Sequence, residues 1–125
     1  MGFLDSLMGN ASEVDPKTLE AEFQKVLMPK ESITRAYQVF RDSFLFTTHR
    51  LILIDKQGMS GKKIAYVSIP YGSITHFSVE TAGHFDLDAE LKIWIRGGDA
   101  PIQKKFSKQL SVYDVQKTLA LYVLK

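Results

Sequence analysis

The sequence contains no cysteine among its 125 residues. It therefore has no disulfide, thiolate metal ligand or cysteine nucleophile, which favours a reducing compartment, and we expect the cytoplasm. The sequence also lacks a large excess of charge of either sign, because 16 basic and 14 acidic residues give a net charge of +2. This balance lacks the basic surplus of nucleic-acid-binding proteins, so we expect no nucleic-acid partner. Long apolar runs are missing as well, and the sequence predicts neither a membrane-spanning helix nor a signal peptide.

What the chain does contain is typical of one globular domain. Its length and its hydrophobic fraction of 45% are enough for a single buried core. Aromatic residues are plentiful, with eight phenylalanines, five tyrosines and one tryptophan. Since aromatic side chains are enriched in strands, the composition favours a mainly β structure.

The N-terminal part shows helical rather than alternating periodicity. Residues 1–9 predict a short helix with one apolar edge, made by Phe3, Leu4, Leu7 and Met8. A second helix is predicted from Asp15, a natural N-cap, followed by Pro16 at the first helical position and ending before Pro29. Its apolar face comprises Leu19, Phe23, Val26 and Leu27. We therefore divide the chain into an N-terminal helical segment, 1–30, and a β-rich part, 31–125, within one structural domain.

After Pro29 the apolar residues alternate, which indicates strands. Seven strands are predicted, at 32–41, 43–46, 51–54, 64–69, 74–81, 90–96 and 102–106. A C-terminal helix follows, with Ser111 as the predicted N-cap and Asp114 at the third position. Its apolar stripe consists of Val112, Val115, Leu119 and Tyr122.

Seven short strands closed by one amphipathic helix predict a pleckstrin-homology-like (PH-like) fold. This is a partly open antiparallel barrel of two orthogonal sheets, in which the helix caps the open end. A generic β-sandwich would not need the closing helix, and a lipocalin-like barrel would usually have an eighth strand. Both alternatives therefore rank lower.

Three segments carry a family resemblance: residues 46–53 (FTTHRLIL), 68–74 (SIPYGSI) and 80–91 (ETAGHFDLDAEL). Their order and their strand and turn contexts are similar to those of the bacterial pleckstrin-homology family, over nearly the whole chain from about Asp15. Thr48-His49 departs from the Asn-Lys expected in the first motif, and Gly72 replaces an expected lysine. The resemblance implies a PH-like fold and ring-like homo-oligomers. It implies no chemistry, because members of this family are mostly of undefined role and have no assigned active site.

Two segments have compositions compatible with ligand binding. His84, Asp86, Asp88 and Glu90 stand at alternate positions, which places four metal-binding groups on one face of an extended chain. Alternate residues of a strand lie ~6.8 Å apart, so at most two reach one ion, and a solvated acidic turn is the better interpretation. Residues 58–63 (GMSGKK) lack the first glycine and the Ser or Thr of a phosphate-binding loop, which favours a hairpin tip. We expect no metal and no cofactor.

No catalytic constellation is recognisable. His49, His76 and His84 lie in separate segments, and no nucleophile motif accompanies them. The start Met1-Gly2 with Ser6 fits an N-myristoylation pattern only formally, because the resemblance is to bacterial proteins. We therefore predict that the protein has no catalytic residues and is not an enzyme.

Trp94 and the apolar edge of the first helix are the candidate contact surfaces. Trp94 interrupts the polar face of the most regular strand, and large apolar groups outside a core often mark interfaces. The first helix either covers Trp94 within one chain or takes part with it in contacts between chains. Phe3, Leu4, Leu7, Met8 and Trp94 are thus the candidate oligomer interface.

The resulting hypothesis is a non-enzymatic PH-like module that self-associates into a ring-like oligomer larger than a dimer and acts as a protein-binding scaffold. The strands at 43–46 and 51–54 are apolar on both faces, which requires something to cover the second face. The alternative is a peripheral domain that binds anionic lipid, and an enzyme ranks third. Specific phosphoinositide binding is not expected, because the first hairpin offers Arg41 beside Asp42 instead of a cluster of basic residues.

Overall fold

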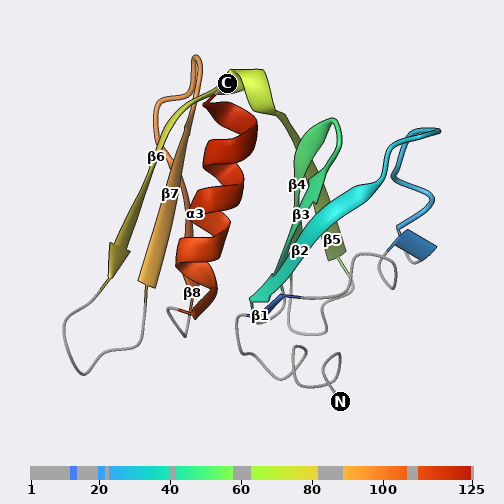
Figure 1. Cartoon of the computed structure of the whole chain (residues 1–125), viewed down its shortest axis with the longest axis horizontal. Coiled ribbons are helices and arrows are strands. Elements are labelled where there is room, and N and C mark those ends of the chain that lie inside the picture. The colour runs from blue at the N-terminus through green and yellow to red at the C-terminus, as the bar shows by residue number, and fades with distance from the viewer. Residues whose placement is uncertain are drawn as a thin grey trace.

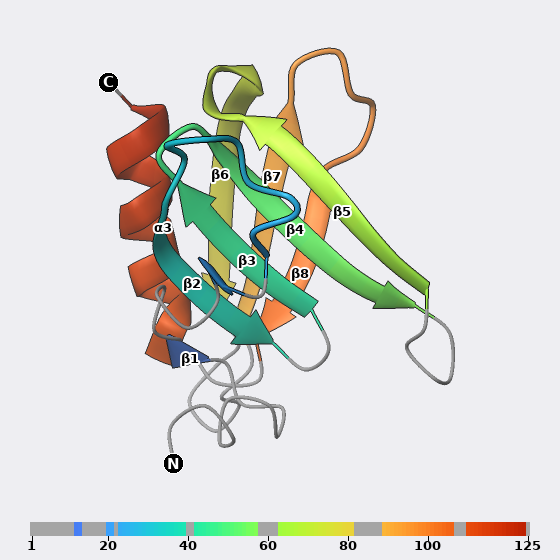
Figure 2. The same ribbon diagram turned by 90° about the vertical axis from the view of Figure 1, so that its right-hand side faces the viewer.

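Two antiparallel sheets enclose one C-terminal helix (Figure 1). The architecture is that of a computed structural model, which describes residues 12–13, 20–21, 23–39, 42–57, 63–81, 89–106 and 110–124. Seen from the side, the strands of the first sheet run obliquely to those of the second (Figure 2). The helix fills the space between the two sheets where they diverge.

The first sheet has the order β1-β2-β3-β4-β5 and the second has the order β6-β7-β8. The first comprises β1 (Ser12–Glu13), β2 (Ile33–Val39), β3 (Asp42–Thr47), β4 (Arg50–Gln57) and β5 (Lys63–Pro70). The second comprises β6 (Ile74–Thr81), β7 (Ala89–Ile95) and β8 (Ile102–Phe106). A 3-10 turn, η1 (Tyr71–Ser73), joins the sheets, and helix α3 (Leu110–Val123) follows β8.

All seven predicted strands are present, and β6 and β8 have the predicted bounds. One further strand, β1, was not predicted, because two residues are too few to show alternation. It pairs with β2 through Ser12 opposite Gln38 and Glu13 opposite Tyr37.

The main core lies between the sheets and the helix. Val115 and Leu119 of α3 are fully buried there. They pack with a cluster from both sheets: Tyr37, Phe44, Phe46, Leu51, Leu53, Ile69, Ile74, Ala89, Leu91 and Ile93. Burial of this apolar surface is the main force that holds the two sheets together.

A second core covers the other face of the first sheet. Leu45, Ile52 and Ile54 are buried there against Phe23, with Val26 and Leu27 packed beside them. The rings of Phe23 and Tyr66 make a T-shaped contact, with 6.3 Å between their centroids. The chain's own residues 23–27 therefore cover the second apolar face of β3 and β4.

The second predicted helix ends earlier than expected. Glu20 and Ala21 have helical backbone, but residues 23–26 form turns. One local and one tertiary contact favour the turns: the Met28 N–H donates to the Glu31 side chain instead of to the Gln24 carbonyl, and Arg50 holds the segment through the Val26 carbonyl. The first helix, 1–9, and the start of the second at Asp15 lie outside the described residues.

The beginning of α3 also differs from the prediction. The helix starts at Leu110, so Ser111 lies inside it and is not its N-cap. Asp114 is not in the first turn and interacts with β2 instead. None of the helices within the described ranges is long and apolar enough to cross a membrane.

Candidate functional site

A partly buried polar network joins helix α3 to strand β2. The Tyr37 hydroxyl donates a 3.0 Å hydrogen bond to Asp114 Oδ2, and Arg35 Nη1 lies 3.2 Å from the same oxygen. Thr118 Oγ1 lies 3.4 Å from the Tyr37 hydroxyl. Burial raises the pKa of Tyr37 to about 12. The network therefore fixes the helix against the sheet through Oδ2 of Asp114.

Aromatic stacking holds the other end of the helix. The ring of Tyr122 stacks on Tyr71, with 4.5 Å between centroids and 10° between planes. The Tyr122 hydroxyl lies 2.8 Å from Thr34 Oγ1, and Thr34 Oγ1 also donates a hydrogen bond to the carbonyl of Phe46. Burial, with the neighbouring Tyr122, raises the pKa of Tyr71. The Tyr71 hydroxyl donates a 2.7 Å hydrogen bond to the Thr47 carbonyl.

Between these two anchors runs a groove along α3 and β2 with a volume of about 360 Å³. It is lined by Thr34, Arg35, Asp114, Lys117, Thr118, Leu121 and Tyr122. Leu121 is 69% exposed, although it is one of the larger apolar side chains. We refer to these seven residues as the α3–β2 groove.

A second polar cluster ties residues 26–31 to the first sheet. The buried carboxylate of Glu31 accepts hydrogen bonds from Arg50 Nε and Nη2, both at 2.9 Å, and from Thr47. Arg50 Nη2 also donates to the Val26 carbonyl. The hydrogen bonds from Arg50 lower the pKa of Glu31 to about 2, against the opposing effect of burial. This cluster is structural, because its groups saturate one another.

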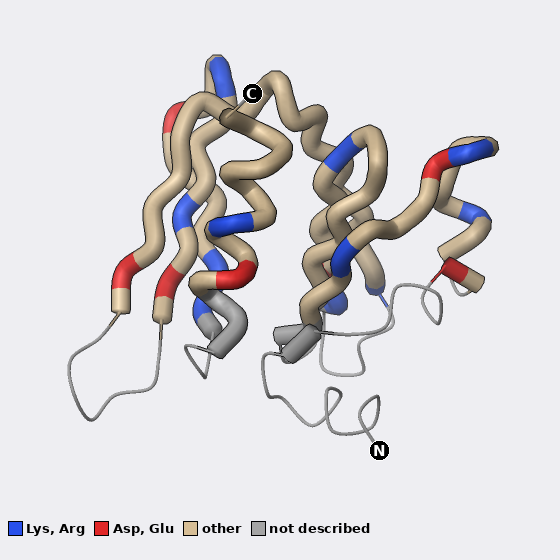
Figure 3. Tube along the Cα trace, in the orientation of Figure 1, with Lys and Arg blue, Asp and Glu red and all other residues tan. Residues whose placement is uncertain are grey.

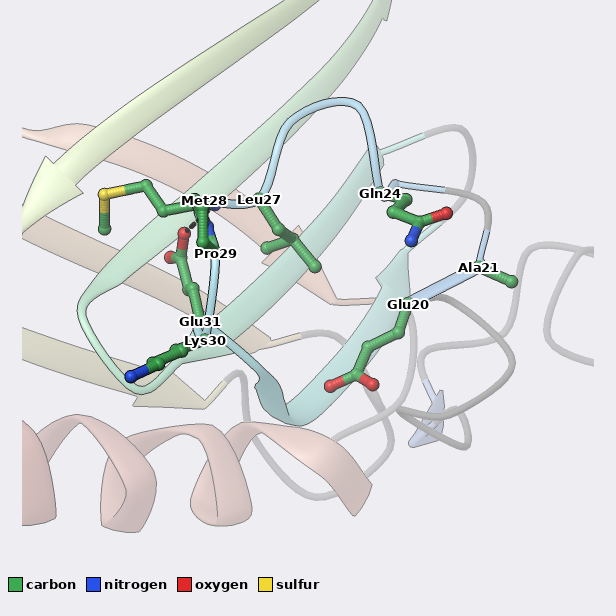
Figure 4. A pocket seen from close by; sticks show the side chains of 8 residues that line it. All are labelled: Glu20, Ala21, Gln24, Leu27, Met28, Pro29, Lys30 and Glu31. Atoms are coloured by element: carbon green, nitrogen blue, oxygen red, sulfur yellow. Dashed lines mark hydrogen bonds between the residues drawn. The ribbon is translucent and has the colours of Figure 1, made fainter.

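A cavity of about 570 Å³ lies beside this cluster (Figure 4). It is lined by one segment only, residues 20–21, 24 and 27–31, and its wall includes Glu20 and Glu31. Glu20 accepts a 2.7 Å hydrogen bond from the Ile33 N–H, so its carboxylate is used to join the segment to β2. The cavity thus results from the way in which this segment turns onto the sheet.

Trp94 lies on the outer face of the second sheet, as the alternation predicted. It stands opposite His76 on β6, and the two rings stack with 4.3 Å between centroids. Trp94 is half-buried and His76 is exposed. Because His76 covers part of the indole ring, Trp94 offers another protein a smaller surface than an unstacked tryptophan would. The other interface candidates, Phe3, Leu4, Leu7 and Met8, lie outside the described residues.

Strand β5 forms one edge of the first sheet (Figure 2). Ile64 is 39% exposed and Val67 is 42% exposed, and they lie on opposite faces of the strand. Within the described ranges, no strand pairs with the outer side of β5. Such an edge is suited to pairing with another chain.

The remaining sequence candidates are only partly described. Residues 58–62, His84, Asp86 and Asp88 lie outside the described residues, whereas Glu90 lies on β7 opposite Glu80. His49 is exposed in the turn between β3 and β4, whereas His76 is exposed on β6 of the other sheet. Within the described part of the chain, no three His, Cys, Asp or Glu side chains are grouped closely enough to hold a metal ion.

Sequence reasoning missed the Tyr37–Asp114 pair and the Glu31–Arg50 pair. Tyr37 and Asp114 are 77 residues apart, and Glu31 and Arg50 are 19 apart. Neither pair forms a local motif. The available signals were Glu31 and Arg50, charged residues directly before the strands predicted at 32–41 and 51–54, and charged residues at such positions are common on protein surfaces.

The comparisons with known proteins agree with this architecture. The family model described as Bacterial PH domain matches residues 2–123. The uncharacterized protein YjqA of Bacillus subtilis is 52% identical over 121 residues, which cover 96% of this chain and 97% of YjqA. The uncharacterized protein YozO of the same organism is 32% identical over 109 residues, which cover 87% of this chain and 90% of YozO.

Solved structures show the same fold. A pleckstrin homology domain from Shewanella amazonensis has a TM-score of 0.83 and 56% identity, and the match covers 99% of this chain and 100% of that one. A DUF1696 family protein with a pleckstrin-homology domain, from Shewanella loihica, has a TM-score of 0.81 and 51% identity, with coverage of 92% and 98%. The two sheets and the C-terminal helix therefore form a PH-like fold, as the sequence predicted.

Proposed function

Since this chain belongs to the bacterial PH domain family, we propose that it is a non-enzymatic module that self-associates into a ring-like homo-oligomer and serves as a scaffold for a protein partner. The fold alone does not specify this function, so the proposal rests on surfaces that suit contact between proteins. The edge of β5 is the observation that carries it.

Strand β5 combines two features of a contact surface. It has exposed apolar side chains on both faces, Ile64 and Val67, and it lies at the edge of a five-stranded sheet. Proteins usually protect such edges with charges or short strands, but β5 has eight residues and its one basic residue, Lys63, stands at its beginning. Contact with another chain would bury these side chains.

The ring follows if β5 of one copy contacts a different surface of the next. Contacts of this head-to-tail kind close into a ring when the rotation between copies permits it. The second apolar face of β3 and β4 is not available for this contact, because Phe23, Val26 and Leu27 cover it. The N-terminal part remains a candidate partner surface, because residues 1–30 carry a net charge of −2 and residues 31–125 a net charge of +4. Such complementary charges orient an encounter more than they stabilise it.

Light scattering coupled to size exclusion tests the proposal. We expect a mass several times the 14.1 kDa of one chain, and a lower mass for Val67→Lys, because a lysine at the edge opposes strand pairing. Leu124→Lys is the matched control, since Leu124 is 68% exposed and lies outside the sheet. It should leave the mass unchanged.

Two further variants separate the candidate surfaces. A chain that lacks residues 1–10 tests Phe3, Leu4, Leu7 and Met8, and Trp94→Ser tests the outer face of the second sheet. A fall in mass in one of these variants identifies the surface that β5 contacts if Val67→Lys also lowers the mass, and it replaces β5 as the contact if Val67→Lys does not. A mass of 14.1 kDa for the wild type at high concentration contradicts self-association altogether.

Binding of anionic lipid is the alternative function. The basic residues of the described part are spread over both sheets and the helix, interspersed with acidic ones (Figure 3). A lipid-binding surface would concentrate positive charge on one side. The same charge distribution therefore favours a protein partner.

A further inference from the structure

The α3–β2 groove has properties that suit a peptide. Its floor is held in place, because Asp114 is tied to Tyr37 and Tyr122 is stacked on Tyr71. Its rim carries Leu121, which is 69% exposed, and Lys117, which is also exposed. Because the floor side chains are already held in place, they lose little conformational entropy when a ligand binds.

The exposed face of α3 continues beyond the groove. Tyr113, Lys117, Leu121 and Leu124 follow at intervals of four, four and three residues, so they lie on one side of the helix. Tyr113 is 51% exposed and Leu124 is 68% exposed. A stripe of this kind on a monomeric surface is a feature of interaction sites.

The charges of the groove select the kind of partner. Two basic residues, Arg35 and Lys117, line it together with one acidic residue, Asp114. Asp114 already accepts hydrogen bonds from Tyr37 and Arg35, so its negative charge is compensated within the chain. The side chain of Lys117 thus gives the rim a positive charge, which complements a carboxylate.

The spacing of the rim residues selects an extended partner. Lys117 and Leu121 are one helical turn apart, a rise of ~6 Å at ~1.5 Å per residue. In an extended chain, side chains two positions apart point to the same side and are ~6.6 to 6.8 Å apart. The stretch of α3 from Asp114 to Tyr122 is ~12 Å long, which matches about four extended residues.

We propose that the α3–β2 groove binds an extended segment of a partner protein in which an acidic and a bulky apolar residue stand two positions apart. Lys117 pairs with the acidic side chain, and Leu121 packs against the apolar one. This inference deepens the proposed scaffold function and rests on it, but it concerns a surface that is separate from the β5 edge.

Fluorescence polarisation with labelled synthetic peptides tests the inference. The probe is a set of eight-residue peptides with one glutamate and one leucine at separations of one, two, three or four positions in an otherwise neutral background. We expect the two-position peptides to bind at least about fivefold more tightly than the others, with an affinity that falls as salt rises. Equal binding at every separation, or no binding by any peptide, overturns the proposal.

Variants of the full chain locate the binding. Lys117→Glu and Leu121→Ser should each weaken binding about tenfold, which corresponds to ~1.4 kcal/mol. Met28→Ser is the control, because Met28 is also an exposed apolar side chain, at 46%, and lies neither on α3 nor in the groove. It should leave binding unchanged. Unchanged binding in both groove variants, or an equal loss in the control, also overturns the proposal.

The oligomeric mass of each variant distinguishes this inference from the proposed self-association. If Val67→Lys lowers the mass and leaves peptide binding intact, the groove functions independently of the ring. Loss of peptide binding together with the mass would place the peptide at an interface between copies, against the proposal. Because Lys117 and Leu121 are exposed, we expect both groove variants to fold, and circular dichroism checks this.

Discussion

At the scale of single residues, the carboxylate of Glu31 makes the stability of the protein depend on pH. It is buried and accepts two hydrogen bonds from Arg50, and its pKa falls from 4.5 to about 2. A carboxyl group whose pKa is lowered by folding stabilises the protein above its unfolded pKa, and this stability is lost as the pH falls towards the folded pKa. The window of this effect is therefore pH 4.5 to about 2.

As the pH falls from 6 to 3, we expect protonation of Glu31 to lower the free energy of unfolding by on the order of 2 kcal/mol. Glu31→Gln should reduce the pH dependence in this range by about that amount, because the titrating group is gone. Urea unfolding at several pH values measures it. Asp99→Asn is the control, since Asp99 is exposed. Equal slopes for wild type and Glu31→Gln would contradict the role assigned to this carboxylate.

Lys30 occupies a backbone conformation that side chains disfavour. Its φ is 70°, the left-handed region, where glycine has no steric penalty. We expect Lys30→Gly to stabilise the protein by about 0.5 to 1 kcal/mol, because relief of strain exceeds the added entropy of the unfolded chain. Lys30→Ala keeps the strain and is the control. Thermal unfolding compares the two, and a glycine variant no more stable than the alanine variant would disprove the prediction.

At the scale of elements, the turns at 23–27 stand in place of the end of a predicted helix and cover the second core. Phe23 is the largest side chain of this cover, and it is only 7% exposed. Its removal would expose apolar surface of Leu45, Ile52 and Ile54 on the far side of the sheet. The segment is thus part of the folded domain and not an appendage.

Phe23→Ala should therefore destabilise the protein by about 3 to 5 kcal/mol, the usual range for truncation of a buried phenylalanine. Gln24→Ala, which changes an exposed neighbour, should cost less than about 0.5 kcal/mol. Chemical denaturation gives both values. If the two variants are equally stable, residues 23–27 do not cover the sheet in solution.

The strands were predictable because each is read from a local pattern. In β7, Leu91 and Ile93 face the core and Lys92 faces outward, as a period of two requires. The segment before β2 was not predictable in the same way. Its helical pattern is real, but the Met28 N–H, which a helix would direct to the Gln24 carbonyl, donates instead to the Glu31 carboxylate that Arg50 holds in place. Tertiary contacts of this kind override local propensity.

The candidate site could be predicted even less than the fold. The α3–β2 groove depends on Thr34 and Tyr122, which are 88 residues apart and whose hydroxyl oxygens lie 2.8 Å apart. In the sequence, Tyr122 is simply one member of the apolar stripe of a helix. Leu121 lies outside that stripe, so the periodicity indicates that it is exposed but not that it lines a groove with Tyr122. Only the way the helix packs on the sheets assigns them different roles.

At the scale of the whole molecule, the distribution of charge predicts which membranes the domain does not recognise. The net charge is +2, and basic residues occur on both sheets and on α3 among acidic ones (Figure 3). Several basic side chains are also engaged within the chain, as Arg50 is with Glu31 and Lys104 is with Asp55. A multiply charged headgroup needs clustered basic side chains that converge on its phosphates.

We therefore expect no specific binding of phosphoinositides. Liposome flotation should give the same weak binding for vesicles that contain a phosphoinositide and for phosphatidylserine vesicles matched in total charge, because only the general attraction of anionic surfaces is available. Raising the salt concentration should abolish both to the same extent, since exposed charges are screened within a Debye length of ~8 Å at physiological ionic strength. Saturable binding to phosphoinositide above the charge-matched control would show that the folded domain, or its assembled ring, gathers basic side chains that are separate in the single chain.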